Sequence, residues 1–345
     1  MMPNTTKNSV SKTIVTTIVL IMLCLTHTDV VAQHGMSREH ALAKNKVTEA
    51  TLLHQVSFLT DSLCHGRGFA TAGGYEAGFW INRYFTRIGL MKFGMSYGKK
   101  VIVDKKQVGY NIVGMLPGSK HGSSNRYIVV GAHYDHLGEL GENMYPGADA
   151  NASGTAALLS LAEMLKALRD NGRTHSYNII FVAFDGKEHN MAGSKAFWKM
   201  IERGELKDPQ NGSDITKDEI KLMVNIDQIG STLSPLKSGR KDYLIMLGTW
   251  SLALEKRELL RSCNQKYAID LDIDLTYYGS SNFTSTFYRL SDQRVFVDHG
   301  IPAVLFTSGI TMNTNKTRDT LESLDIRILK KRIFLIYHWI DKMAQ

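Results

Sequence analysis

Residues 177–201 read YNIIFVAFDGKEHNMAGSKAFWKMI, and the fold class can be inferred from this stretch. Residues 177–184 are almost continuously apolar, which is typical of a strand buried on both faces. Residues 192–201 have the apolar spacing of a helix, and the polar residues 185–188 lie between the two. A buried strand, a polar turn and a helix in this order predict an α/β protein.

The same alternation extends in both directions along the chain. Further strands are expected at residues 110–116, 127–130, 220–226, 242–247 and 303–307, and helices at 36–66, 77–90, 156–168 and 324–343. This order predicts a doubly wound, mostly parallel sheet with helices on both faces. In such sheets ligands bind beyond the carboxyl ends of the strands. We expect one α/β domain over residues 33–345.

The first residues have the pattern of an export signal. Two lysines precede an apolar run at residues 14–25, and Val30, Val31 and Ala32 form a small-residue cleavage site. The apolar run is shorter than the ~20 residues of a membrane span. A signal peptide at residues 1–32, a secreted or periplasmic protein and no membrane span after its removal are therefore expected. A retained anchor is the alternative.

The formal charge of +8 does not by itself indicate nucleic acid, because the Lys and Arg residues are scattered and accompany no recognised binding motif. After cleavage two cysteines remain, Cys64 and Cys263. They are far apart in the sequence, so whether they pair is left open. Neither lies in a CxxC or beside a histidine, so neither is expected to be a nucleophile or a zinc ligand.

Several polar motifs follow the expected strands. In order they are GAHYDHLG (131–138), PGADANASG (146–154), FVAFDGKEHNMAGS (181–194), VNIDQIGS (224–231), SDQRVF (291–296) with HGIPAVLFTSG (299–309), and NTNKTRDTLESLD (313–325). The first holds His133 and Asp135. A histidine at a strand end can bind a metal while a nearby carboxylate orients its ring.

These blocks, in this order and spacing, resemble the zinc exopeptidase family of the bacterial leucyl aminopeptidases and glutaminyl cyclases. The resemblance runs from about His54 to the C-terminal helix. It implies a site with two zinc ions bridged by one Asp, further His, Asp and Glu ligands, and a Glu that serves as general base. The same superfamily includes the transferrin receptor ectodomain, which is not an enzyme.

Four positions keep the residue types that the resemblance implies. His133 matches a His ligand and Asp135 the carboxylate that orients it. Asp227 matches the Asp ligand of the same zinc, and Glu188 matches the Glu ligand of the other zinc.

Three positions that the resemblance implies as metal ligands or general base are substituted. Ala150 stands where the bridging Asp is implied, Lys187 where the general base is implied, and Asn315 where the distal His is implied. The Ser-Asp-His block has also become Ser-Asp-Gln at Gln293. Methyl, ammonium and carboxamide groups are poor zinc ligands.

Charge counting leads to the same expectation. Glu188 and Asp227 remain as anions, and Lys187 opposes them, so the local charge is too small to balance two zinc ions. We expect no zinc at full occupancy and at most a weakly bound single ion. We also expect the Lys187 ammonium to pair with the remaining carboxylates.

Other assignments of these residues remain open. Asp149 can substitute for the missing bridge only if it turns toward the site. His133, His136 and Asp227 are an alternative set for a weak single-metal site. Ser153 has no GxSxG frame, so we expect it to cap a helix.

We expect Asp319 and Asp325 to cap the final helix. An aromatic cluster is expected in the core and the pocket wall, and it consists of Tyr277, Tyr278, Phe283, Phe287 and Tyr288.

Two function classes follow. The first is an exported pseudopeptidase that binds a peptide, an amino acid or a partner protein without hydrolysis, in the cleft that holds the active site in the related enzymes. The alternative is an active zinc-dependent aminopeptidase or glutaminyl-cyclase-like enzyme with a rearranged single-metal site. A third, weaker class rests on charge alone, namely a basic surface that binds an anionic polymer or lipid.

Overall fold

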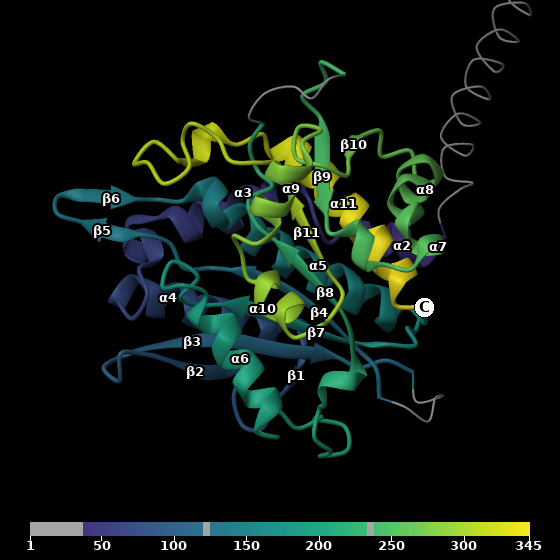
Figure 1. The fold of residues 1–345 in the computed structure, drawn as a ribbon, viewed down its shortest axis with the longest axis horizontal. Helices are drawn as coiled ribbons and strands as arrows, with labels where there is room; N and C mark the ends of the chain where they lie inside the picture. The colour runs from purple at the N-terminus through teal and green to yellow at the C-terminus, as the bar shows by residue number, and fades with distance from the viewer. Residues whose placement is uncertain (1–36, 120–124, 233–237) are drawn as a thin grey trace, which may run out of the picture.

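A nine-stranded mixed sheet forms the centre of the described part of the chain (Figure 1). The structure is a computed structural model that describes residues 37–119, 125–232 and 238–345. The predicted signal peptide at residues 1–32 lies outside the described residues. The strand order is β1-β3-β7-β4-β8-β11-β9-β10, with β2 paired to β3.

The four inner strands are parallel. They are β7 (Asn178–Phe184), β4 (Tyr127–His133), β8 (Ile220–Ile226) and β11 (Ala303–Thr307). On one side follow the antiparallel β3 (Gln107–Leu116), β1 (Met91–Lys92) and β2 (Gly98–Val103), and on the other β9 (Tyr243–Leu247) and β10 (Asp272–Asp274). A separate hairpin pairs β5 (Gly138–Leu140) with β6 (Asn143–Tyr145). The predicted α/β fold with a mostly parallel central sheet is confirmed.

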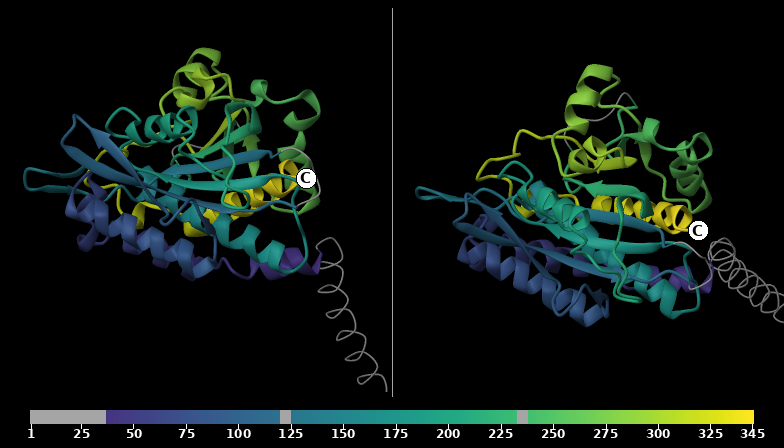
Figure 2. Two further views of the ribbon diagram at one scale, coloured as in Figure 1. Left: turned by 90° about the horizontal axis from the view of Figure 1, so that it is seen from below. Right: turned by 60° about the horizontal axis from the view of Figure 1, so that its bottom comes forward.

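Helices cover both faces of the sheet (Figure 2). One face carries α2 (Arg38–Lys44), α3 (Glu49–Thr60), α4 (Ala72–Ile88), α5 (Gly154–Asp170), α8 (Leu259–Lys266) and α11 (Ile326–Met343). The other carries α6 (Ala192–Glu202) and α10 (Gln293–Asp298). The short α7 (Leu254–Arg257) precedes α8, and α9 (Ser281–Tyr288) lies beside the C-terminal half of the sheet. Within the described ranges, no helix has the length and apolarity required to span a membrane.

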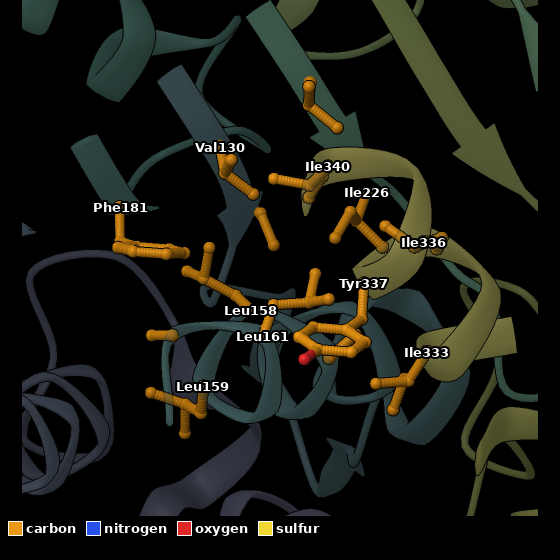
Figure 3. Close-up of a cluster of buried hydrophobic side chains, with 14 of the residues drawn as sticks. Val130, Leu158, Leu159, Leu161, Phe181, Ile226, Ile333, Ile336, Tyr337 and Ile340 are labelled. Atoms are coloured by element: carbon orange, nitrogen blue, oxygen red, sulfur yellow. The ribbon is translucent and has the colours of Figure 1, made fainter. Parts of the chain in front are cut away.

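The core consists of two layers because side chains alternate along each strand. Val130 of β4 and Phe181 of β7 point to the same layer as α5 and α11, where Leu158 and Ile336 pack against them (Figure 3). Their neighbours along the strands point to the opposite layer and meet α6 and α10. The continuously apolar strands are therefore buried on both faces, as the sequence predicts.

The helix expected over residues 36–66 is divided into three pieces. α2 ends at Lys44, and Thr48 begins α3 with a capping box in which its side chain accepts from the Thr51 N–H at 3.1 Å. A short helical segment η1 (Ser62–Arg67) follows, with His65 at φ 41° and Gly66 at φ 64°. The apolar spacing continues across these breaks, so periodicity alone did not reveal them.

We predict that His338 makes the stability of the folded chain sensitive to acid. It lies fully buried on α11 and stacks on Tyr267 with ring centroids 3.5 Å apart, and its ring nitrogens have no hydrogen-bond partner among the described residues. Burial and the neighbouring His40 lower the pKa of His338 to about 2. The unfolded chain takes up this proton near pH ~6.5. Below that pH the free energy of unfolding is therefore expected to fall, because only the unfolded state gains the proton.

The check is urea unfolding of the native chain and of His338→Phe between pH 7 and pH 4. The variant keeps the ring stacking and is expected to lose less stability on acidification than the native chain. His54→Phe, at an exposed position, is the matched control and should follow the native profile. Parallel profiles for native and His338→Phe proteins would contradict the assignment.

Candidate functional site

The retained site residues meet at the carboxyl edge of the parallel strands. His133 is the last residue of β4, Lys187 and Glu188 follow β7, and Asp227 follows β8. These three strands are neighbours and run in the same direction, so their ends lie side by side. The topology thus brings together residues that are far apart in the sequence.

His133 and Asp227 form a pair in which the histidine is fully buried and the carboxylate is partly exposed. The His133 Nε2 lies 3.4 Å from Asp227 Oδ1, and the imidazole is fully buried. Burial alone would lower the pKa of His133, but the carboxylates of Asp227 and Asp135 outweigh it and raise the pKa to about 10. Burial opposes ionisation of Asp227 as well, yet His133 and the Lys187 ammonium hold the pKa of Asp227 below its usual range. The pair is therefore a protonated imidazole against a carboxylate.

Asp135 positions the turn after β7 more directly than it orients His133. Its carboxylate accepts the N–H groups of Lys187 at 3.0 Å and Glu188 at 3.1 Å. The His133 Nδ1 lies 3.0 Å from the main-chain carbonyl of Asp135 and 3.6 Å from its carboxylate. The nearer acceptor for His133 is thus the carbonyl of Asp135, whereas the sequence suggested its carboxylate.

Lys187 is an ion-pair partner in this site. Its Nζ lies 2.9 Å from Glu188 Oε1, and the two side chains are 21% and 20% exposed. Burial would lower the pKa of Lys187, but the carboxylates of Asp227 and Glu188 outweigh it and raise the pKa above its usual value. The amine therefore carries a positive charge at the position where the resemblance implies a base.

Ala150 presents a methyl group where the resemblance implies the bridging carboxylate. It lies in the irregular helical segment η2 (Ala148–Ser153) and is 4% exposed. Its main-chain N–H donates to the Asp319 carboxylate at 3.1 Å, and the N–H of Asp149 donates to the same carboxylate at 2.9 Å. Asp319 therefore holds this turn and does not cap the final helix, which is capped by Asp325 through the Ile328 N–H at 3.0 Å.

Asn151 joins the turn to two strands. Its side-chain amide donates to the carbonyl of Ile226 at 2.9 Å, at the end of β8, and to that of His133 at 3.3 Å, at the end of β4. Its side-chain oxygen accepts from the N–H of Gln228 at 2.8 Å and of Gly154 at 3.1 Å. One fully hydrogen-bonded amide thus sets the spacing between the strand ends and the start of α5.

Asp149 points away from the His133–Asp227 pair. Its carboxylate accepts the N–H of Gly230 at 2.7 Å and of Ser231 at 3.2 Å, and also bonds the Ser231 hydroxyl. The Ser153 hydroxyl donates to the Asp149 carbonyl at 2.8 Å and accepts from the Ile229 N–H at 3.0 Å. Ser153 therefore ties the turn to the loop after β8, and the prediction that its side chain caps α5 was wrong.

Arg67, which the sequence did not single out, holds the loops next to the site in place. The guanidinium is fully buried and donates to the carbonyls of Tyr134 and Pro146 at 2.7 Å and of Gly147 at 2.8 Å, and also to that of Leu59. Its partners are main-chain carbonyls at the end of α3 and on loops around the site. No sequence motif marked this role, because any nearby strand end offers such carbonyls.

His136 does not join His133 in the site. Its ring is 2% exposed and lies against Gly147, and neither ring nitrogen has a hydrogen-bond partner in the described structure. Burial and the Arg67 charge lower the pKa of His136 to about 3. The ring is therefore neutral and packs against the turn that begins at Gly147.

The residue set does not fit the zinc centre that the resemblance implies. Among residues 37–119, 125–232 and 238–345, no three His, Cys, Asp or Glu side chains are arranged to hold a metal ion. Asn315 lies exposed at φ 59°, Ala150 offers a methyl, and the Lys187 ammonium bonds to one of the remaining carboxylates. Zinc requires several thiolate, imidazole or carboxylate donors around one point.

A pocket of about 250 Å³ opens beside these residues. Its lining has a polar part and an apolar part. The polar part includes Lys187, Asp227, Gln228 and Asn315, and the apolar part includes Ala150, Tyr277, Phe287, Leu290, Leu305 and Ile310. The expected placement of Tyr277 and Phe287 in the pocket wall is observed, whereas Tyr278 and Phe283 are 37% and 59% exposed and lie outside the lining. The pocket is somewhat smaller than the ~300–1,000 Å³ typical of small-molecule sites, so it suits a single side chain or chain end.

Two more residues of this region escaped the sequence analysis. The Gln228 side chain donates to the Gly309 carbonyl and to Thr314 Oγ1 at 3.3 Å, which attaches the loop that carries Asn315. Asp292 is fully buried with no hydrogen-bond partner among the described residues, and burial raises its pKa to about 6. The altered Ser-Asp-Gln block was the available signal for Asp292.

The two cysteines are separate buried thiols. Cys64 and Cys263 are both free, and burial raises the pKa of each to about 11. Neither is a thiolate near neutral pH, so neither adds a nucleophile to the site.

Comparisons with known proteins agree with this architecture. Residues 111–340 match the model of peptidase family M28. Leucine aminopeptidase 1 of Aspergillus clavatus is 25% identical over 297 residues, which cover 82% of this chain and 66% of that protein. The BOS complex subunit ncln of Danio rerio is 31% identical over 146 residues, or 39% of this chain and 24% of that protein.

Solved structures share the fold at lower identity. LapB from Legionella pneumophila has a TM-score of 0.66 and 18% identity, and the match covers 89% of this chain and 75% of that one. The glutaminyl cyclase of Porphyromonas gingivalis has a TM-score of 0.59 and 13% identity, over 86% of this chain and 98% of that one. The chain thus spans just under two thirds of the aminopeptidase relative named above and most of these structures.

Proposed function

This chain belongs to peptidase family M28, and from that premise we propose that it is a non-catalytic member that binds a peptide or a partner protein in the family's cleft. The proposal includes export to a secreted or periplasmic location, which rests on residues 1–32 and their signal-like pattern.

The observation that carries the proposal is the ion pair between Lys187 and Glu188 at 2.9 Å. A general base must accept a proton near neutral pH, and an ammonium group with a raised pKa has no free lone pair with which to accept one. The same ammonium neutralises carboxylates that a divalent metal would need. Ala150 supplies neither charge nor lone pair in its place.

The pocket supports binding of a chain end or an apolar side chain. The polar part of the lining offers both a cation, Lys187, and an anion, Asp227, while the aromatic and aliphatic wall offers apolar contact. The similarity to a protein named as a subunit of the BOS complex supports a protein partner as the occupant. A free amino acid is the smaller alternative occupant.

The test begins with the native chain purified without chelator. We expect zinc far below one ion per chain by elemental analysis, and no turnover of aminoacyl or N-terminal glutaminyl substrates. Stoichiometric zinc with turnover that a chelator abolishes would establish the alternative, an active zinc enzyme with rearranged ligands.

A binding measurement completes the test. Peptides selected by the native chain from a library should lose at least about tenfold in affinity for Ile310→Glu, which places a charge in the apolar part of the pocket lining. Leu254→Glu is the matched control, since Leu254 is 75% exposed and lies outside the pocket. Equal affinities for both variants would remove the pocket from the proposal.

A further inference from the structure

A second hollow, of about 430 Å³, lies between strand β2 and helix α6 and shares no lining residue with the site pocket. We call it the basic groove. Its lining includes Lys100 and Ile102 of β2 and Lys195, Lys199 and Met200 of α6, with Arg203 at the end of that helix. The groove takes part neither in the ion-paired site nor in the proposed peptide binding.

Cationic side chains from α6 and from β2 line the two sides of the basic groove. Lys195, Lys199 and Arg203 are spaced four residues apart at α6, so they form one stripe with a rise of ~6 Å between neighbours. Lys100 faces them from β2. The opposing acids in the lining are Asp104 and Glu205, and Glu205 lies 3.9 Å from Arg203. The groove therefore has an excess of positive charge.

The lysines of the groove lack internal partners. Across the described ranges, Lys100, Lys195 and Lys199 have no carboxylate within 4.0 Å. Like charges four residues apart on a helix lie next to each other on its surface and repel. An anion bound from outside would relieve the repulsion between Lys195 and Lys199, whereas Arg203 already has Glu205 beside it.

From this geometry we propose that the basic groove binds a linear acidic glycan, a sugar chain that carries sulfate or carboxylate groups. The stripe of cations matches a chain with repeating charges. Because the cations border a recess between a strand and a helix, an elongated chain can reach them better than a planar lipid surface can.

The uncharged part of the lining distinguishes among linear polyanions. It contains no Phe, Tyr or Trp on which nucleic-acid bases could stack, and its aromatic residue, His189, packs against Phe69 with ring centroids 4.9 Å apart. It does contain Met200, Ala196 and Ile102, which is 61% exposed. These apolar side chains can cover the C–H faces of sugar rings, which polyphosphate lacks.

The test uses a fluorescent heparin oligosaccharide and the full chain in ~0.1 M salt. We expect Lys195→Gln/Lys199→Gln to bind it about tenfold more weakly, and the slope of log affinity against log salt to fall by about 1.4, since each lost contact contributes about 0.7. Both side chains are exposed, so the fold should be retained, and thermal melting checks this.

The matched control is Lys46→Gln/Lys217→Gln, which removes the same charge from two exposed positions outside the groove. It should bind like the native chain. Equal losses in both variants would show attraction by net charge alone and overturn the proposal. Tighter binding of polyphosphate, or of phosphatidylglycerol vesicles, than of the glycan would overturn it in favour of those ligands.

Discussion

A variant that carries Ala150→Asp, Lys187→Glu and Asn315→His is expected to bind zinc at least about 100-fold more tightly than the native chain. The substitutions add two carboxylates and an imidazole and remove the ammonium that bonds to Glu188. All three positions line the same pocket, so the new donors face the retained Asp227. Competition with a fluorescent zinc chelator measures the change.

The matched control is Ala150→Asn/Lys187→Gln/Asn315→Gln, which has similar side-chain volumes and no new anion. It should bind zinc no better than the native chain, because carboxamides are poor zinc ligands. If the two triple variants bind zinc equally, the charge balance of the cleft is not what excludes the metal. If neither binds, the positions matched to the family are wrong.

Substitution of Arg67 by Met is expected to lower the free energy of unfolding by about 4 kcal/mol or more. The buried guanidinium donates to the carbonyls of Leu59, Tyr134, Pro146 and Gly147. Met fills similar volume but leaves these carbonyls without their donor, and a buried unsatisfied polar group costs ~1–3 kcal/mol. Urea unfolding followed by circular dichroism provides the measurement.

Arg327→Met is the matched control, because Arg327 is 76% exposed and its nearest carboxylate is 3.8 Å away. A change below about 0.5 kcal/mol is expected there. Peptide affinity of Arg67→Met should fall as well, since Arg67 holds Pro146 and Gly147 at the start of the turn that carries Ala150. A loss no larger than that of the control would show that these carbonyls find other donors.

Most of the fold was predictable because it follows from local pattern. The buried strand at residues 178–184 is a run of apolar residues, and α5 and α11 have a helical period of apolar positions. Hairpin β5–β6 was missed because its strands have three residues each and are largely exposed, and edge strand β2 because its apolar run, residues 101–103, is too short to show a period. The break between α2 and α3 was missed because the apolar period continues through it.

The candidate site was predictable in its residue types and only partly in its contacts. The placement of His133, Lys187, Glu188 and Asp227 at one sheet edge follows from strand ends in a parallel sheet. The hydrogen-bond partners of the Asp149 and Asp319 carboxylates could be identified only in the tertiary structure. Each binds main-chain N–H groups, Asp149 those of the loop after β8 and Asp319 those of the turn that contains Ala150.

Residue order alone decided that this chain adopts an α/β fold and that a methyl, an ammonium and an amide stand at positions 150, 187 and 315. Those statements hold whatever the neighbours are, because donor chemistry belongs to the side chain itself. The tertiary structure decided which carboxylates face the pocket and which accept main-chain N–H groups. It also decided that Arg67 donates to the carbonyls at the start of the turn that contains Ala150. The direction of a side chain depends on partners brought from distant parts of the chain, and no local pattern encodes those contacts.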